Sequence, residues 1–382
     1  MVTPTDGFAR GLVAEFAPLR NYSALREDWL SLEQLADSTF FATWAWAGSW
    51  ISLLPVDERP LVCRISSADR LVALAVFGTR RRWRLALPFR QLLLNASGSE
   101  ARDSIHIEMN QLLAIRGCEL AAWRALLKAL LHSDRQQRCD ELLLAGLAAG
   151  ASVSEVAAEC GLATHSTERS APYVDLERVR TAGEYSTLLR TKGRYGIRRA
   201  LRDYRRTLGE PTLVRAGTAV QAEEFLRGLA EFHQLRWTAK GQRGAFATPA
   251  FRKFHETLIR EHFAHGCLDL FRVQCAATII AFIYAFRYRD VAYFYQCGFN
   301  YRALPAHNQP GYVALPLVIK HYAASGALTF EFLAGEEDYK KRLATHSRAL
   351  VWLEVQRPGV RTALLRCYRA LRNKVLTAAQ PR

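Results

Sequence analysis

The sequence predicts an α+β fold of three layers (α/β/α), with two successive halves that each hold a mixed sheet and with a basic helix at the C-terminus. In the second half, helical periodicity gives way at about Leu268 to three consecutive strand patterns, and helices and strands then alternate to Val355. The first half also passes from helices into strands. The chain has 382 residues and is 50% hydrophobic, which suits two domains with substantial cores. We place the domains at residues 1–175 and 176–357, followed by a tail at 358–382.

In the first half, short periodic segments alternate between helical and extended character. Helices are predicted at Trp44–Leu54, Glu119–His132 and Ala148–Gly161. Strands are predicted at Leu61–Ile65, Leu71–Thr79, Leu85–Pro88 and Glu141–Leu147. A basic run, Arg80–Arg84, separates two of these strands, and an extended segment at Ala171–Leu176 joins the halves.

The second half begins with helices and ends with alternating helices and strands. The first helices are predicted at Tyr185–Leu208, Ala222–Thr238 and Thr248–Ala264. Strands joined by tight turns follow at Leu268–Gln274, Ala276–Tyr288 and Asp290–Gly298. The last elements are two helices at Pro310–Ser325 and Glu336–Ala344, and two strands at Leu328–Leu333 and Ala349–Val355. A strand meander that leads into such alternation is typical of a three-layer domain.

Several classes of protein are disfavoured by patterns that the sequence lacks. No run approaches the ~20 apolar residues that span a bilayer, and the N-terminus lacks the basic-then-apolar pattern of a secretory signal. The eight cysteines form no CxxC pair, and none has a histidine at zinc-ligand spacing. We therefore expect free thiols, no metal site and a cytoplasmic location. The absence of G-x-S-x-G, P-loop and G-x-G-x-x-G motifs argues against hydrolases, NTPases and dinucleotide enzymes.

A series of aromatic and basic motifs occurs along the chain in a definite order. The motifs are Phe40–Trp46 with Trp50, Arg194–Arg199, His233–Trp237, Gly244–Phe246, Phe254–His255, Tyr295–Phe299 and Phe330–Lys340. Their order and spacing resemble the CelD/BcsL family of GNAT-like acetyltransferases, which is linked to exopolysaccharide and cellulose synthesis and is related to the Fem-type aminoacyl transferases. The resemblance covers nearly the whole chain and rests on no single motif. It departs from the family at Glu331, where an aspartate is common, and near Leu343, where an aromatic residue is missing.

The resemblance implies two GNAT-like halves, with acyl-CoA as a co-substrate and no permanently bound cofactor. In GNAT enzymes the donor's pyrophosphate sits on backbone amides at a helix N-terminus, where unpaired N–H groups and the helix dipole favour an anion. The corresponding residues here are Asn308, Gln309, Gly311 and Tyr312, which open the helix around Pro310. Gly311 would let the backbone approach a phosphate closely. The alternative is an ordinary strand–helix loop.

Two residues are candidates for the chemistry at the thioester. Many GNAT enzymes use a tyrosine to protonate the departing thiolate, and Tyr339 stands at the corresponding place; Lys340 or Lys341 would favour its anion and lower its pKa. Glu331 lies inside an apolar strand, where partial burial would raise its pKa and suit it to act as a base. The alternatives are that Tyr339 packs at a helix–sheet boundary with its hydroxyl in water, and that Glu331 pairs with an arginine across the sheet.

Other residues of these motifs are candidates for the acceptor site. His233 and Arg236 lie three residues apart and so share a helix face, where they would act as a base and an anion clamp. The alternative for each is an ordinary helix-surface residue. We assign substrate binding to six residues, Arg194, Arg198, Arg236, Trp237, Tyr295 and Lys340.

Basic residues are concentrated in a few segments of a chain whose net charge is +16. Arginines recur every four residues from Arg190 to Arg206, on a helix with a separate apolar face. Such a surface suits a nucleotide-linked donor, RNA or anionic lipid, and the alternative is a solvated helix face. The tail at 358–382 also forms a basic amphipathic pattern, whose alternative is packing onto its own domain. Together with Arg80–Arg84, these segments predict loose association with an anionic surface of the inner membrane.

The sequence therefore predicts an acyl-CoA-dependent N- or O-acyltransferase that acts on an envelope, polysaccharide or lipid precursor. The amine or hydroxyl of the acceptor would attack the thioester directly, in a cleft between the two halves. Three alternatives remain open: a long-chain N-acyltransferase of ceramide-type lipid synthesis, a Fem-like transferase that uses aminoacyl-tRNA, and a non-catalytic nucleic-acid-binding protein. Apart from aminoacyl-tRNA, nucleic acid is not an expected partner, because the basic residues lack interleaved aromatics for base stacking.

Overall fold

The computed structural model describes residues 11–68, 70–105, 107–132, 139–148, 150–305, 309–335 and 337–378. The contacts within the chain divide it into two compact units. Unit 1 comprises residues 1–168 and 350–382, and unit 2 comprises residues 169–349. The chain passes from one unit to the other within two strands, β7 (Ala163–Asp175) and β13 (His346–Gln356).

Unit 1 is built on a mixed sheet whose strands follow the order β1-β2-β3-β4-β6-β13. Neighbouring strands are antiparallel except β4 and β6, which are parallel. The strands are β1 (Val13–Pro18), β2 (Leu61–Ser67), β3 (Arg70–Arg84), β4 (Leu87–Leu94), β5 (Leu113–Ala114), which pairs with β3, and β6 (Glu141–Leu147). The helices are α1 (Tyr22–Leu35), α2 (Trp44–Ser52), α3 (Glu119–His132), α4 (Gly150–Glu159) and α11 (Val360–Ala378).

The core of unit 1 forms where α3 and α4 pack on this sheet. Apolar residues at helical spacing, among them Ala122, Leu126 and Val153, meet the alternating side chains of the central strands. Local caps begin two of the helices. Asn21 accepts a hydrogen bond from the Ala24 amide at 3.0 Å to start α1, and Thr43 accepts one from Trp46 to start α2.

The basic run Arg80–Arg84 is part of strand β3 and not a separate segment. Strand β3 pairs with β4 as far as Arg84 and Leu87, and the chain turns through Leu85 and Ala86, which have φ values of 53° and 56°. Two positive φ values in a two-residue loop are typical of the type I′ hairpin turn. The predicted strand at Leu85–Pro88 therefore began two residues early, because this turn contains no glycine, asparagine or aspartate to mark it.

In unit 2 the paired strands follow the order β7-β12-β11-β10-β9-β8. Its strands are antiparallel except β11 and β12, which are parallel. The further strands are β8 (Pro211–Arg215), β9 (Leu268–Cys275), β10 (Thr278–Tyr288), β11 (Val291–Phe299) and β12 (Thr329–Glu331). The helices are α5 (Leu176–Ala182), α6 (Thr191–Leu208), α7 (Ala219–Ala239), α8 (Pro249–His262), α9 (Gly311–Ala324) and α10 (Asp338–Leu343).

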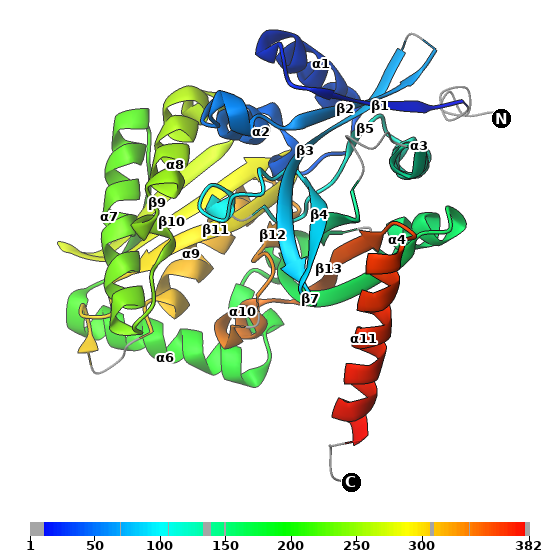
Figure 1. The fold of residues 1–382 in the computed structure, drawn as a ribbon. Coiled ribbons are helices and arrows are strands. Elements are labelled where there is room, and N and C mark those ends of the chain that lie inside the picture. Colours follow the sequence, from blue (N-terminus) through cyan, green and yellow to red (C-terminus); the bar gives the residue numbers. More distant parts are fainter. Residues whose placement is uncertain are drawn as a thin grey trace. The chain divides into compact units, whose positions relative to one another are not determined.

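Helices cover both faces of the unit 2 sheet, as Figure 1 shows. Residues of α6 and α9, such as Ile197 and Val318, share a buried core with one face of β9, β10 and β11. Helix α7 packs on the other face and contacts the same three strands, and α8 packs on α7. The predicted three-layer α/β arrangement is confirmed.

Most predicted elements of unit 2 are present, with shifted ends. The helix predicted from Tyr185 begins only at Thr191, because Tyr185–Leu188 forms a 3-10 turn. Helix α5 and strand β8 were not predicted, and neither were β1 and α1 in unit 1. In the part of the chain that the structure describes, no helix is both long enough and apolar enough to cross a membrane.

Candidate active site

Two parallel strands of unit 2 separate where the candidate catalytic residues lie. Strand β12 pairs with β11 over three residues, and the last pair is Tyr293 with Glu331. Strand β11 then continues to Phe299 and remains paired with β10 on its other side. The backbone of 294–299 therefore extends past the end of β12. A strand edge of this kind can bind the extended amide chain of a ligand through main-chain hydrogen bonds.

Glu331 ends strand β12 as a buried carboxyl group. Its side chain is 1% exposed, and its Oε1 atom forms an ion pair with Arg348 Nη2 at 2.8 Å. Its Oε2 atom is buried and has no hydrogen-bond partner among the described residues. Arg348 reaches Glu331 across the ring of Tyr173, which lies 4.4 Å from its guanidinium carbon.

Burial raises the pKa of Glu331 to about 7, and the nearby Arg348 acts in the opposite direction. The two interpretations of Glu331 made from the sequence therefore hold together: it is paired with an arginine, and its pKa lies near neutrality. A carboxyl group with that pKa can accept a proton from an acceptor at neutral pH. Oε1 is paired with Arg348, whereas Oε2 has no partner among the described residues and is available to accept that proton.

Tyr339 lies on α10 and packs against the core of unit 2. Burial, followed by the proximity of Cys297 and Glu337, raises the pKa of Tyr339 well above its usual value. The prediction that Lys340 or Lys341 lowers this pKa is therefore wrong. The Lys340 ammonium is turned toward the preceding loop, where it donates to the Ala334 carbonyl at 3.0 Å and lies 3.5 Å from Glu337. Tyr339 thus stays protonated at neutral pH and keeps a proton to donate.

Two residues near Tyr339 were not recognised as site candidates from the sequence. Burial raises the pKa of the Cys297 thiol to about 12, and Lys340 partly opposes this. Burial and Cys297 raise the pKa of Tyr301, while Arg236 lowers it. Both residues lie at the end of β11 or just after it, next to the Tyr295–Phe299 motif, and that position was the available signal.

His233 and Arg236 share helix α7 but have different surroundings. His233 is buried, packs on Phe246 at 5.2 Å between ring centroids, and bonds to Gln234 at 3.3 Å. Burial lowers the pKa of His233, so its imidazole is neutral at neutral pH. Arg236 is exposed and stacks on the Tyr301 ring at 4.4 Å. His233 is therefore not the helix-surface residue of the alternative interpretation, whereas Arg236 is connected to the tyrosines at the end of β11.

The remaining substrate-binding candidates are dispersed over unit 2. Trp237 is partly buried beneath Lys240, and Tyr295 packs in a cluster of aromatic rings that includes Phe251 and Phe286. On α6, Arg194 donates to the carbonyls of 187 and 189 and so holds the preceding turn. Arg198 is exposed.

One of the amides that were expected to face a phosphate, that of Tyr312, is used within the first turn of α9. Asn308 lies outside the described residues. The carbonyl of Gln309 accepts from the Tyr312 amide at 3.1 Å, and the Pro310 carbonyl accepts from the next two amides. A Cβ atom on Gly311 would lie 3.3 Å from the Phe299 ring, so this glycine permits close packing of α9 on the end of β11. Tyr312 is buried against Gly196 of α6.

Among the residues with described positions, no group of histidine, cysteine, aspartate and glutamate side chains is arranged to hold a metal ion. The described cysteines are free thiols. The polar groups beside the end of β12 are the buried carboxyl of Glu331, the guanidinium of Arg348 and the phenol of Tyr173, and a carboxyl with a pKa near 7 suits proton transfer.

Residues 191–341 match the model of a family described as the acetyltransferase (GNAT) domain. This segment lies within unit 2 and contains the strand separation, Glu331 and Tyr339. None of the curated proteins matches the chain.

Several solved structures share the fold at low sequence identity. FemX is 10% identical, with a TM-score of 0.58 over 89% of this chain and 96% of its own. The C-terminal DUF2156 domain of a protein assigned as a lysylphosphatidylglycerol synthetase, from Agrobacterium fabrum, is 13% identical, with a TM-score of 0.54 over 92% and 96%. L-PGS from Bacillus licheniformis is 11% identical, with a TM-score of 0.53 over 90% and 96%. The chain thus has a GNAT-like fold, and the match of residues 191–341 to an acetyltransferase (GNAT) domain supports acyltransferase activity.

Proposed function

We propose that this protein transfers an acyl group from acyl-CoA to an amine or hydroxyl of an envelope, polysaccharide or lipid precursor. The observation that carries the proposal is Glu331, a buried carboxyl with a pKa of about 7 at the point where β11 and β12 separate. The match of this segment to an acetyltransferase (GNAT) domain supplies the reaction class.

The proposed reaction is a direct transfer in which two residues of unit 2 move protons. Glu331 takes the proton from the attacking nitrogen or oxygen as that atom bonds to the thioester carbonyl carbon. The carbon–sulfur bond then breaks, and the Tyr339 hydroxyl protonates the departing thiolate. Backbone amides of β11 beyond Tyr293, where β12 no longer pairs with this strand, are suited to polarise the carbonyl oxygen.

The acyl donor can be identified by thermal-shift measurements with CoA, acetyl-CoA and palmitoyl-CoA. A ligand that binds only the folded protein stabilises it by ~2.7 kcal/mol at a concentration of 100 times its Kd. We expect at least one thioester to raise the melting temperature and to release free thiol when an acceptor is added. Absence of both effects with all three compounds would contradict the proposal.

The acceptor proposal follows the resemblance to CelD/BcsL-type enzymes, which implies a polysaccharide-linked substrate. Release of thiol from the preferred acyl-CoA can be measured with amino sugars, sugar alcohols and long-chain amino alcohols in parallel. Selective stimulation by a long-chain amino alcohol, together with palmitoyl-CoA as donor, would favour the lipid-forming alternative over the polysaccharide one.

A Fem-like transferase that uses aminoacyl-tRNA is the second candidate. The exposed side of α6 favours it, because Lys192, Arg198, Arg202 and Arg206 all face solvent there. FemX also shares the fold, although at 10% identity that likeness concerns the fold alone. Purification of tRNA with the protein, and transfer from a charged tRNA but from no acyl-CoA, would select this candidate.

We also propose that unit 1 associates loosely with an anionic membrane surface. Helix α11 packs on unit 1 through Thr362 and Leu365, whereas Leu364, Tyr368 and Leu371 are exposed along its opposite side. A helix with an exposed apolar stripe beside arginines suits the lipid–water interface. Sedimentation with anionic vesicles tests this proposal, and unchanged binding after deletion of residues 358–382 would contradict it.

A further inference from the structure

A pocket of about 540 Å³ in unit 1 is lined by an unusual excess of arginines. Strands β3 and β4 and the start of α11 form its walls. The lining residues are Arg81, Pro88, Phe89, Arg90, Asp140, Arg357, Pro358, Gly359, Val360, Arg361 and Thr362. Four arginines against one aspartate give these walls a net charge of +3. Glu331 and Tyr339 belong to unit 2, so this pocket is distinct from the candidate active site.

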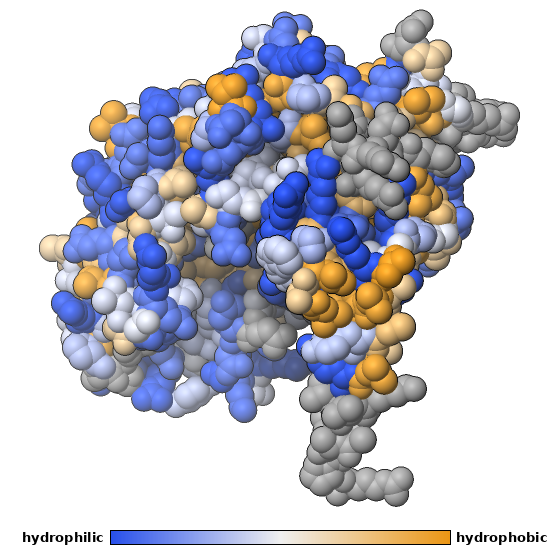
Figure 2. All heavy atoms as spheres, in the orientation of Figure 1, coloured by the Kyte–Doolittle hydropathy of each residue, from blue (hydrophilic) through white to orange (hydrophobic). Residues whose placement is uncertain are grey.

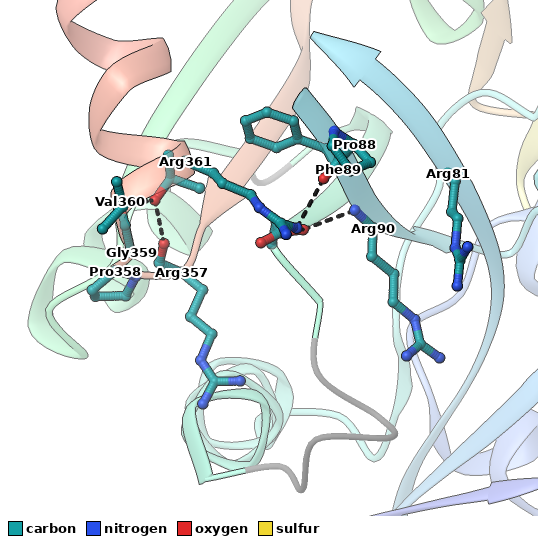
Figure 3. A pocket seen from close by; sticks show the side chains of 11 residues that line it. Arg81, Pro88, Phe89, Arg90, Arg357, Pro358, Gly359, Val360 and Arg361 are labelled. Carbon is teal, nitrogen blue, oxygen red and sulfur yellow. Dashed lines mark hydrogen bonds and ion pairs between the residues drawn. The ribbon is translucent and has the colours of Figure 1, made fainter. Parts of the chain in front are cut away.

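Arg81 and Arg90 stand directly opposite each other on the paired strands β3 and β4. Their side chains extend from these strands in the same direction, as Figure 3 shows. Like charges at directly opposed positions of a sheet destabilise it. Neither guanidinium forms an ion pair or a side-chain hydrogen bond within the described part of the chain. An anion between them would remove this repulsion.

The other two arginines are held in place by carbonyl groups. Arg357 donates through Nη2 to the Leu131 carbonyl at 2.6 Å, and its Nη1 atom is buried with no hydrogen-bond partner among the described residues. Arg361 donates to the Pro88 carbonyl at 2.9 Å and so ties the start of α11 to β4 (Figure 3). The pocket therefore combines two anchored arginines with two that are unpaired among the described residues, and guanidinium groups gathered in this way suit a phosphate.

Asp140 offsets one of the four positive charges, that of Arg361, and no other carboxylate among the described residues lines the pocket. The Asp140 Oδ2 atom accepts a hydrogen bond from the Arg90 backbone amide at 2.8 Å and lies 3.6 Å from Arg361. Residues at the start of α11 also line the pocket, so the positive end of the helix dipole lies beside it.

The rim of the pocket is apolar and exposed. Val360 lines the pocket, is 78% exposed, and begins the stripe that continues through Leu364 and Leu371 on α11. Trp83 is 70% exposed and lies opposite the pocket-lining Pro88 in the β3–β4 pair. Figure 2 shows the apolar side chains gathered over α11, next to hydrophilic surface. Tryptophan and arginine beside aliphatic side chains are typical of a protein surface that meets a bilayer interface.

We infer that this pocket binds the phosphate group of an anionic membrane lipid while the apolar rim contacts the acyl-chain boundary. The inference rests on the membrane association proposed above and names the site that selects anionic lipid. A soluble phosphate compound would match the four arginines equally well, but it would leave Trp83 and the α11 stripe in water.

The test compares two variants of the full chain with the unmodified protein. Arg81→Ala/Arg90→Ala removes the two opposed arginines. Within the described part of the chain their guanidinium groups form no ion pair or hydrogen bond, so the fold should not depend on them. Arg82→Ala is the matched control, because Arg82 lies between Arg81 and Trp83 on β3 and its side chain points to the other face of the strand. Binding is measured by sedimentation with phosphatidylcholine vesicles, with and without phosphatidylglycerol.

We expect the unmodified protein and Arg82→Ala to bind the anionic vesicles and not the neutral ones. Arg81→Ala/Arg90→Ala should bind the anionic vesicles about 25-fold more weakly, from roughly fivefold for each arginine at an anionic surface. Equal losses in Arg82→Ala and in the double variant would overturn the inference, because they would show diffuse charge attraction. Full binding by the double variant would also overturn it. If, in that case, deletion of residues 358–382 abolished binding, the proposed membrane association would still stand and only the lipid site would fail.

Two further measurements separate the lipid from other anions. Inorganic phosphate and glycerol phosphate are tested by thermal shift, and a short RNA is tested by filter binding, each against the same variants. If a soluble phosphate stabilised the unmodified protein but not the double variant, while both proteins bound vesicles equally, the pocket would be assigned to a soluble ligand. RNA binding that depends on Arg81 and Arg90, with vesicle binding that does not, would assign the pocket to nucleic acid. Either result would contradict the lipid site.

Discussion

At the scale of single residues, the surroundings of Glu331 decide its chemistry. A glutamate in an apolar strand is equally compatible with a structural ion pair and with a catalytic base when only its neighbours in sequence are known. The structure supplies both Arg348, at 2.8 Å, and enough burial to bring the pKa to about 7. The carboxyl is therefore ionised for part of the neutral pH range and protonated for the rest.

Glu331→Gln should lower kcat/KM by about 100-fold or more, which is the usual contribution of a general base. In the unmodified enzyme, kcat/KM should rise with pH through a single limb near pH 7, as Glu331 loses its proton. Arg348→Met should move that limb to higher pH, because Arg348 lowers the pKa of Glu331. Thiol release at a series of pH values measures both effects, and Glu224→Gln on the exposed side of α7 is the control. A limb that stays in place in Arg348→Met would refute the assignment.

The same carboxyl should make stability depend on pH. Because its pKa is higher in the folded state than in the unfolded chain, the folded state holds this proton more tightly. The resulting stabilisation is complete below the pKa of the unfolded glutamate and is lost as pH rises through about 7. The melting temperature of the unmodified protein should therefore fall relative to that of Glu331→Gln between about pH 5 and pH 8. Parallel melting curves of the two proteins across that range would not fit this account.

Tyr339→Phe should lower kcat by about 100-fold, since it removes the proton that the thiolate receives. The pKa of Tyr339 is raised well above its usual value, so the tyrosine should add no alkaline limb to the rate profile near neutral pH. Tyr195→Phe is a suitable control, because Tyr195 is 61% exposed on α6. If Tyr339→Phe were fully active, the thiolate would have to be protonated by another group or by water.

At the scale of elements, helices α6 and α10 fit together through a glycine. A Cβ atom added to Gly193 of α6 would overlap the backbone carbonyl oxygen of Arg342 at the end of α10. A backbone atom cannot move aside as a side chain can, so the helices must separate. Helical periodicity predicted a helix at Tyr185–Leu208, which matches α6 at its C-terminal end, but no sequence pattern indicated that Gly193 is a contact point.

Gly193→Ala should reduce the free energy of unfolding by roughly 1–3 kcal/mol, the usual cost of overpacking. It should also lower activity, because α10 carries Tyr339. Urea unfolding measures the first effect. Gly217→Ala is the matched control, since its added Cβ would meet only the Gln221 side chain, at 3.8 Å. Equal stability of the two variants would mean that α6 and α10 do not pack in this way.

At the scale of the whole molecule, the C-terminal segment completes the first unit. Residues of β13, among them Leu353 and Val355, are buried in the same core as Leu142 and Leu144 of β6. Unit 1 is therefore assembled from both ends of the chain. Its last strand can join the sheet only after unit 2 has been synthesised.

Truncation after residue 357 and truncation after residue 349 should have different outcomes. The first keeps β13 and removes α11, whose buried described side chains are Thr362 and Leu365, so we expect a folded protein with a modestly lower melting temperature. The second also removes four buried apolar side chains of β13, worth about 1.5–3 kcal/mol each, from a domain whose total stability is ordinarily about 5–15 kcal/mol. They are Leu350, Val351, Leu353 and Val355. We expect it to aggregate or to lose cooperative unfolding. Circular dichroism and size-exclusion chromatography compare the two, and a stable, cooperative protein ending at 349 would disprove this dependence.

The three-layer fold class and most of the elements in their order followed from the sequence, because hydrophobic periodicity and turn residues act over short stretches of chain. The elements β1, α1, α5 and β8 did not. The sequence also singled out Glu331 and Tyr339 as candidates for proton transfer. Only the tertiary structure decided the pairing of Glu331 with Arg348, the burial that raises the pKa of Tyr339, and the meeting of arginines from β3, β4 and α11 in one pocket. These features depend on residues far apart in the chain, and the pKa of a group is set by the burial and the charges that folding brings to it.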